Sequence, residues 1–252
     1  MRVSEYGTRW YLFIERVKTG VDGLDNLIEG GVPKDTVTLV SGPPGSGKTI
    51  LCYNFLSKGL ESGDKCLFLT MDNKAEKLIT QAKELGFDFQ SAIENGKLKF
   101  VFLDINKKLV YDVMTKEILS GDYNRIVLDS VTPLSEIPIN VEKTELTDAA
   151  NLITSDDFSL TVDGPPSRMH LHYIMDLLDI AQCTSMITSE LLFGSFELSR
   201  DGISEFLVDG IILLNLDSTM DRRKLSVMKM RSTKHTLRPR DIKIGVGGIT
   251  LI

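Results

Sequence analysis

Residues 36–49 read TVTLVSGPPGSGKT, an apolar stretch that runs directly into a glycine-rich loop. The loop, Gly42 to Thr49, fits the pattern G-x-x-x-x-G-K-[S/T], and residues 48–61 after it carry apolar side chains at helical spacing. A strand, a glycine-rich loop and a helix in this order predict a P-loop, in which backbone N–H groups and the helix dipole hold phosphate oxygens. The alternative is a glycine-rich turn that binds nothing.

The residue types of this loop point to a nucleoside triphosphate with magnesium. Lys48 is expected to neutralise the β- and γ-phosphates, and the Thr49 hydroxyl is expected to ligate Mg²⁺. We therefore expect ATP and Mg²⁺ as cofactors. The predicted nucleotide-binding residues of this stretch are Gly42, Pro43, Pro44, Gly45, Ser46, Gly47, Lys48, Thr49 and Ile50.

A P-loop protein also needs a carboxylate at the end of a neighbouring strand to hold the magnesium shell. Asp129 fits this requirement, because it follows four residues of an apolar strand in RIVLDS, residues 125–130. The alternative is an acidic residue that only caps the strand.

Short apolar runs alternate with helical segments along the chain, which is the pattern of βαβ units. We expect an α/β fold with a mostly parallel central sheet flanked by helices. The predicted strands are 36–41, 65–70, 98–103, 125–130 and 184–189, and the predicted helices are 48–61, 74–85, 107–119 and 168–182. After residue 205 the helical period disappears, and an antiparallel extension of the sheet is expected.

One domain covering residues 1–252 is preferred, because neither an internal repeat nor a Pro/Gly/Ser-rich linker interrupts the pattern. Residues 135–167 contain several acids and end in GPPS, so they are expected to form an insertion or a mobile loop.

Composition excludes several classes of protein. The chain has 252 residues, 42% of them hydrophobic, and a formal charge of −6, which argues against disorder and against bulk attraction to nucleic acid or an anionic membrane. No apolar run approaches the ~18 residues of a membrane span, and the N-terminus lacks signal-peptide features, so a cytoplasmic location is expected. The three cysteines form no CxxC motif and are expected to be buried thiols, namely Cys52, Cys66 and Cys183.

Several stretches along the chain stand in a characteristic order around the P-loop: TGVDGLDNLIEGGVPKDTVTLVSGPPGSGKT (19–49), CLFLTMDN (66–73), ELGFDF (84–89), NGKLKFVFLD (95–104), RIVLDSVTPL (125–134), SMITSE (185–190) and KMRSTKH (229–235). In order and spacing, these motifs resemble the KaiC branch of the RecA-type ATPases. The resemblance extends over about residues 18–252, apart from 135–167.

The resemblance implies a catalytic carboxylate after the second predicted strand. In that family the strand ends in two glutamates, of which the first is catalytic; here the matching residues are Asp72 and Asn73. Asp72 is one methylene shorter, and a misplacement of about 1 Å can cost ~100-fold in rate, so slow hydrolysis is expected. Asn73 cannot act as a base. The alternative for Asp72 is a helix N-cap.

Basic residues crowd the last part of this otherwise acidic chain. In KaiC-like proteins a K-x-R pair reaches the γ-phosphate held by the neighbouring subunit, and the matching residues here are Lys229 and Arg231. The same match places His235 at the neighbour's nucleotide. The resemblance thus implies a homo-oligomer, a hexameric ring with nucleotide bound between subunits. The alternative for Lys229 and Arg231 is an exposed strand face, and the alternative for His235 is an ordinary surface histidine.

Three functions are compatible with these residues. The leading one is an ATP-binding, slowly hydrolysing protein that acts as a nucleotide-controlled assembly or regulatory switch. A DNA-binding recombinase relative is disfavoured, because the loop after Asp129 is acidic and contains a single aromatic residue, Phe158. A pseudoenzyme that binds ATP structurally is the third, favoured by the missing glutamates.

Overall fold

The computed structural model describes residues 14–107, 109–136 and 168–252. The predicted insertion at 135–167 therefore falls almost entirely outside the described residues, and its first two residues end helix α6 (Thr132–Glu136).

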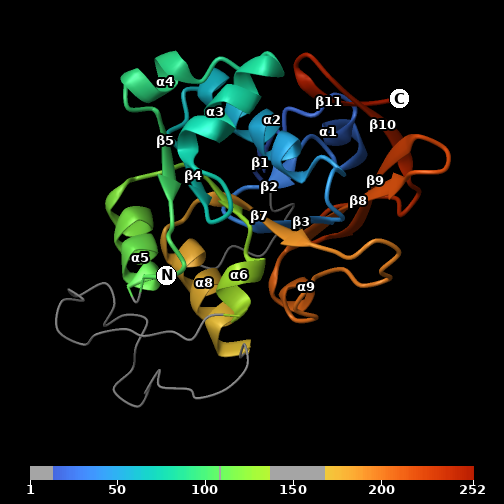
Figure 1. Cartoon of the computed structure of the whole chain (residues 1–252). Coiled ribbons are helices and arrows are strands. Elements are labelled where there is room, and N and C mark those ends of the chain that lie inside the picture. Colours follow the sequence, from blue (N-terminus) through green and yellow to red (C-terminus); the bar gives the residue numbers. More distant parts are fainter. Residues whose placement is uncertain (1–13, 108, 137–167) are drawn as a thin grey trace, which may run out of the picture.

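In the described part of the chain, nine strands form one sheet (Figure 1). These strands are β3 (Val37–Gly42), β4 (Cys66–Thr70), β5 (Leu98–Phe102), β6 (Arg125–Asp129), β7 (Thr184–Glu190), β8 (Gly210–Asp217), β9 (Arg222–Met230), β10 (Arg240–Gly245) and β11 (Gly248–Leu251). A separate antiparallel pair, which the sequence did not predict, joins β1 (Arg16–Val17) to β2 (Val32–Pro33).

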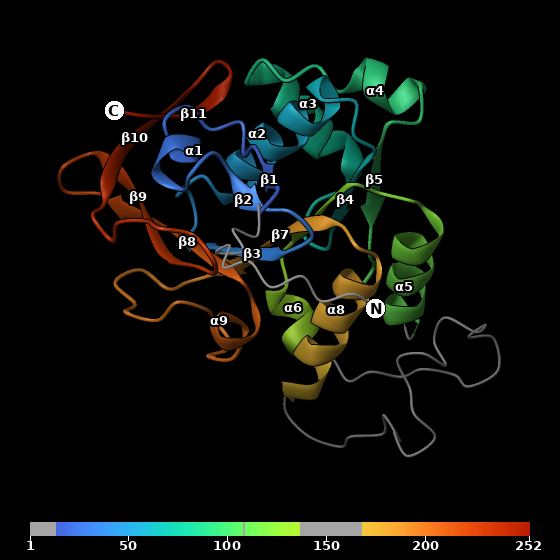
Figure 2. The ribbon, with the colours of Figure 1, turned by 180° about the vertical axis from the view of Figure 1, so that it is seen from behind.

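The order of the strands across the sheet is β11-β10-β9-β8-β3-β7-β6-β4-β5. Strands β8, β3, β7, β6, β4 and β5 pair in parallel, whereas β8 to β11 pair in antiparallel fashion. Seen from behind, β5 and the C-terminal strands form opposite sides of the sheet (Figure 2). The structure thus confirms the parallel core and its antiparallel extension.

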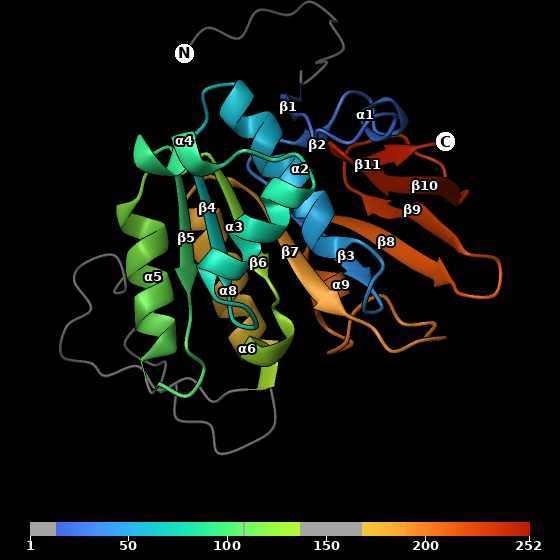
Figure 3. The same ribbon diagram turned by 45° about the horizontal axis from the view of Figure 1, so that its top comes forward.

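Helices cover both faces of the sheet, as Figure 3 shows. One core layer lies under α2 and α3, and the other lies under α5 and α8. No described helix is long and apolar enough to cross a membrane. The described helices are α1 (Leu24–Leu27), α2 (Lys48–Glu61), α3 (Ala75–Glu84), α4 (Gln90–Glu94), α5 (Val110–Ser120), α6, α8 (Arg168–Ile180) and α9 (Ser204–Leu207).

The three cysteines are free and buried, as predicted. Burial raises the pKa of each thiol: well above its ordinary value for Cys52, to about 12 for Cys66 and to about 11 for Cys183. These thiols therefore stay protonated at neutral pH and serve as small apolar side chains.

A buried arginine ties the N-terminal segment to the sheet and to α2. The Arg125 side chain is 4% exposed, and its Nε donates to Asp64 Oδ2 at 2.7 Å. Its Nη1 donates to the carbonyl oxygens of Lys18 and Phe55 at 2.7 and 2.8 Å. Gly59 makes room for it, since a Cβ there would lie 2.5 Å from Arg125 Cδ. One guanidinium thus connects β6, α2 and the segment before α1.

We expect Arg125→Met to lower the free energy of unfolding by about 3 kcal/mol, because it leaves Asp64 and two carbonyl groups without their cationic partner. Urea denaturation measures the effect. Lys99→Met is the matched control, since the Lys99 side chain is 56% exposed in its ion pair with Glu117 and should contribute less than about 1 kcal/mol. Equal losses in the two variants would contradict the assignment of Arg125 as an internal clamp.

Candidate functional site

The glycine-rich loop lies where β3 ends and α2 begins, as predicted. Gly47 precedes the helix with φ 107°, a conformation that favours glycine, and no side chain caps the helix. Gly42 is equally constrained, because a Cβ there would lie 2.5 Å from Leu214 O. The first backbone N–H groups of α2 are therefore left for a ligand, and a helix N-terminus favours an anion.

Lys48 folds back over the loop that carries it. Its Nζ donates to the carbonyl oxygens of Gly42 at 2.9 Å and Pro43 at 3.3 Å. Burial lowers the pKa of Lys48, and the carboxylates of Glu190 and Asp129 oppose this shift. The ammonium group thus sits at the loop with negative charge beside it, where it can exchange loop carbonyls for phosphate oxygens.

Asp129 joins the end of β6 to the start of α2. Its Oδ2 accepts a hydrogen bond from Thr49 Oγ1 at 2.7 Å, and its Oδ1 accepts one from Thr188 Oγ1 on β7. The structure therefore brings together the two residues that the sequence proposed as magnesium ligands. A hydroxyl and a carboxylate are oxygen ligands of the kind that Mg²⁺ takes beside the phosphates of a nucleotide.

The loop also contains a buried hydroxyl without a partner among the described residues. Ser46 is 1% exposed, and its Oγ makes no hydrogen bond. Buried polar atoms are nearly always satisfied in proteins, so this orphan fits a loop built around a polar ligand. Together with Lys48, Thr49 and Asp129, it makes the residues present a good fit to ATP and Mg²⁺.

Asp72 lies just past the end of β4, at the rim of the same site. Helix α3 has Lys74 at its N-cap position and no side-chain cap, so the alternative of Asp72 as the helix cap is wrong. Partial burial raises the pKa of Asp72, and the negative charges of Glu190 and Asp129 raise it further. The positive charge of Lys48 opposes these effects. Asn73 is directed elsewhere, since its Oδ1 accepts from Lys77 Nζ at 2.9 Å.

The structure adds residues that sequence reasoning missed at this site. Glu190 is the last residue of β7, and Thr188 lies two residues before it. An acidic residue directly after an apolar strand was the signal that identified Asp129, and TSMITSE carries the same signal; the predicted strand at 184–189 stopped one residue short of it. Thr132 also contributes, since its hydroxyl oxygen accepts from Glu190 N at 3.1 Å.

Lys229 and Arg231 lie at the other end of the sheet. Lys229 pairs with Ile211, which pairs with Leu39, and Arg231 N donates to Asp209 O beyond the start of β3. Leu39 lies three residues before Gly42, about 10 Å along β3, and the Lys229 ammonium group is held further from the loop by the carbonyl oxygen of Val208. These two basic residues are therefore not brought to the chain's own loop.

Each residue of this distant group is bound within its own chain. Lys229 Nζ donates to the carbonyl oxygens of Glu205 and Val208 at 3.0 and 2.6 Å. Arg231 Nη1 forms an ion pair with Asp209 at 3.0 Å and remains 56% exposed. His235 is half-buried, with Nδ1 3.1 Å from Thr233 O.

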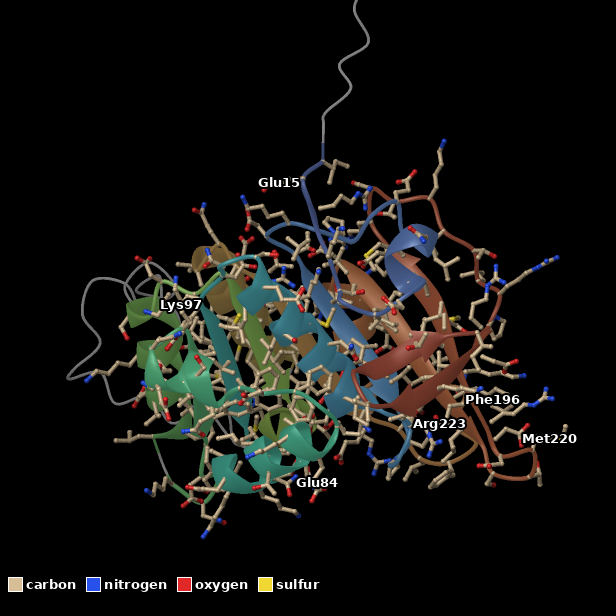
Figure 4. All side chains as sticks on the ribbon, turned by 90° about the horizontal axis from the view of Figure 1, so that it is seen from above. Glu15, Glu84, Lys97, Phe196, Met220 and Arg223 are labelled. Atoms are coloured by element: carbon tan, nitrogen blue, oxygen red, sulfur yellow. The ribbon has the colours of Figure 1, made fainter. Side chains whose placement is uncertain are left out.

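Another arginine of β9 does reach the loop of its own chain. Arg223 Nε donates to Gly45 O at 3.2 Å. Figure 4 labels its side chain on the same side of the molecule as Met220, in the turn between β8 and β9. Strand β9 therefore carries basic groups at both ends, one against its own loop and one set far from it.

Comparison with known proteins agrees with this arrangement. Residues 17–252 match the family model described as "ATPase: KaiC". The chain is 31% identical to "UPF0273 protein MK0039" of Methanopyrus kandleri, over 94% of this chain and 91% of that protein. It is 28% identical to "Circadian clock protein KaiC3" of Synechocystis, over 88% of this chain but only 42% of that longer protein.

A solved structure has the same fold. The KaiC-like protein PH0186 of Pyrococcus horikoshii superimposes with a TM-score of 0.73 at 28% identity, over 95% of this chain and 99% of that one. The family match covers nearly the whole chain, and the loop, Asp129 and the mostly parallel sheet stand in the order that the motifs predicted. The chain belongs to the KaiC family of RecA-type, ATP-binding ATPase domains.

Proposed function

We propose that this protein binds ATP with Mg²⁺ at the loop, hydrolyses it slowly in the cytoplasm, and uses the bound nucleotide to control its assembly into a ring of identical subunits. The observation that carries the proposal is the convergence of Lys48, Thr49, Asp129 and Asp72 at the carboxyl ends of neighbouring parallel strands. Thr49 and Asp129 would hold magnesium there, and the ion would neutralise the charge that develops on the phosphates.

The slow rate follows from the length of one side chain. Asp72 is the proposed base or water-orienting carboxylate, and Asp129 is a poor candidate because both of its oxygens accept hydrogen bonds from threonine hydroxyls. An aspartate reaches one methylene less far than the glutamate of the family. The attacking water is then held less well, and misplacement of this size is costly.

The far-end position of Lys229 and Arg231 supports a role in trans. Neither residue approaches the chain's own loop, so any contact with a γ-phosphate has to be with that of a neighbour. Contacts of this head-to-tail kind form a ring where the rotation between subunits closes and a filament where it does not, and the family resemblance favours the ring. To make them, Arg231 has to leave Asp209, and Lys229 has to leave two carbonyl oxygens. This exchange of partners would link assembly to the nucleotide state, and His235 would lie at the same interface.

Lys48→Ala is expected to abolish nucleotide binding, because the β- and γ-phosphates lose their positive charge and the loop loses two internal hydrogen bonds. Titration with a fluorescent ATP analogue measures this. Lys58→Ala is the control on the same helix, since Lys58 pairs with Glu61 near the surface. If Lys48→Ala binds as well as Lys58→Ala, the loop is not the nucleotide site.

Variants of Asp72 distinguish a slow enzyme from a protein that only binds ATP. Asp72→Glu should raise turnover by restoring the reach of the carboxylate, and Asp72→Asn should lower it by about 100-fold, the scale of a general base. Affinity for ATP should change little in either variant. Steady-state phosphate release by the wild type and by these two variants measures the effect. Equal slow rates in all three would favour a structural nucleotide.

Assembly should depend on nucleotide, because Lys229 and Arg231 gain a phosphate partner at each interface. Light scattering should show a larger particle, a hexamer, with ATP and Mg²⁺ than without them. Mixing adds a sharper test: Arg231→Ala and Lys48→Ala should each be inactive alone, yet regain part of the ATPase rate when combined. A monomer under all conditions, or no recovery on mixing, argues against action in trans.

A further inference from the structure

Glu190 is held firmly at the mouth of the glycine-rich loop. In the parallel register of β3 and β7 it stands opposite Gly42, the first residue of the loop. Its backbone N–H donates to Thr132 Oγ1 at 3.1 Å, and the next N–H, of Leu191, donates to Gly42 O at 3.0 Å. The Cα of Glu190 is thus fixed on one side to α6 and on the other to the loop.

The direction of the Glu190 side chain follows from the strand. Alternate residues of a strand share one face of the sheet, so Glu190 extends on the same face as Thr188. Thr188 is bonded to Asp129 there, whereas Ser189 faces the other side and accepts from Arg200 N at 2.9 Å. The Glu190 carboxylate therefore lies over the phosphate side of the site, and its charge acts on both Lys48 and Asp72.

The carboxylate of Glu190 is exposed and has no hydrogen-bond or ion-pair partner among the described residues. Asp129 differs, because both of its oxygens are occupied by threonine hydroxyls. Asp72 is also at the site but is the shorter side chain. Of these three carboxylates, Glu190 has the longest side chain, and no described residue forms a hydrogen bond or ion pair with its carboxylate.

We infer that Glu190 is a second catalytic carboxylate, which holds the attacking water together with Asp72. The inference rests on the proposed function and names a residue in addition to it. The water oxygen bonds to the γ-phosphorus, and the bond from that phosphorus to the β,γ-bridging oxygen breaks, with the electron pair leaving on ADP. The water proton passes to the carboxylate pair and then to solvent, so that ADP and phosphate are the products.

Two carboxylates that hold one water act as a unit, so the rate losses caused by replacing each of them are not additive. Glu190→Gln and Asp72→Asn should each lower kcat by about 100-fold. The double variant should fall no more than a few-fold below the slower single one, whereas independent roles predict about 10⁴-fold. Adding Asp72→Glu to Glu190→Gln should raise kcat about tenfold above that of Glu190→Gln alone, because the longer side chain restores the reach of the carboxylate.

Glu197→Gln is the matched control. It makes the same substitution in the segment that follows β7, at an exposed side chain whose carboxylate is contacted by Ser195 Oγ at 3.5 Å. Its turnover should equal that of the wild type. ATP affinity, measured with the same fluorescent analogue, should be unchanged or tighter in Glu190→Gln, because a negative charge near the phosphates has been removed.

Three outcomes would overturn the inference: a Glu190→Gln rate equal to that of Glu197→Gln, a loss of ATP binding in Glu190→Gln, or additive losses without rescue by Asp72→Glu. A separate measurement covers the case in which the wild type binds ATP but does not hydrolyse it, so that the proposed turnover fails. Glu190→Gln should then raise the preference for ATP over ADP if its carboxylate faces the γ-phosphate. An unchanged preference would reject that position.

Discussion

The hydrogen bonds that Asp129 accepts from Thr49 and Thr188 hold the functional end of the molecule together. They connect the end of β6 to the first turn of α2 and to β7. Each of these elements is anchored by apolar residues in one or both core layers. A carboxylate in this position aligns the loop, the proposed magnesium ligands and the neighbouring strand ends, so the chemistry of the site depends on the packing of the sheet.

Charge is unevenly distributed around that centre. Among the described residues, Lys48 and Arg223 are the cations that contact the loop. Asp72, Asp129 and Glu190 all act on Lys48 or on one another. A bound triphosphate would add further negative charge to this group. Neutralising this charge requires a divalent cation and basic groups from another subunit. This requirement is consistent with the proposed roles of Mg²⁺ and of Lys229 and Arg231 supplied by a neighbour.

Strand β9 carries basic residues at both of its ends, and the two ends serve different places in the molecule. Arg223 contacts the loop at one end, and Lys229 is bonded near α9 at the other. A strand rises about 3.3 Å per residue and bends little, so the two ends cannot serve the same nucleotide. The segment after Glu190 leads to α9, and the carbonyl oxygens of Glu205 in α9 and of Val208 directly after it accept hydrogen bonds from Lys229. One continuous stretch of chain thus runs from the chain's own phosphate site to the residues proposed to act on a neighbour.

The sequence by itself determined the local units of this protein. The glycine-rich motif predicted the junction of β3 and α2, because its glycines adopt backbone conformations that other residues avoid. Apolar runs predicted five of the six parallel strands within a residue or two; the sixth, β8, was assigned to the antiparallel extension but pairs in parallel with β3. Glu190 and Thr188 were missed, although TSMITSE ends in an acid as the strand of Asp129 does. An acid at a strand end can equally face solvent, so this signal alone does not place it beside the loop. Only the order of the strands across the sheet, set by the packing of helices on its two faces, decided which strand ends meet. The antiparallel register of β9 on β8 kept Lys229 and Arg231 away from their own loop. The residue at which α3 begins, with Lys74 at its N-cap position, excluded Asp72 as a helix cap.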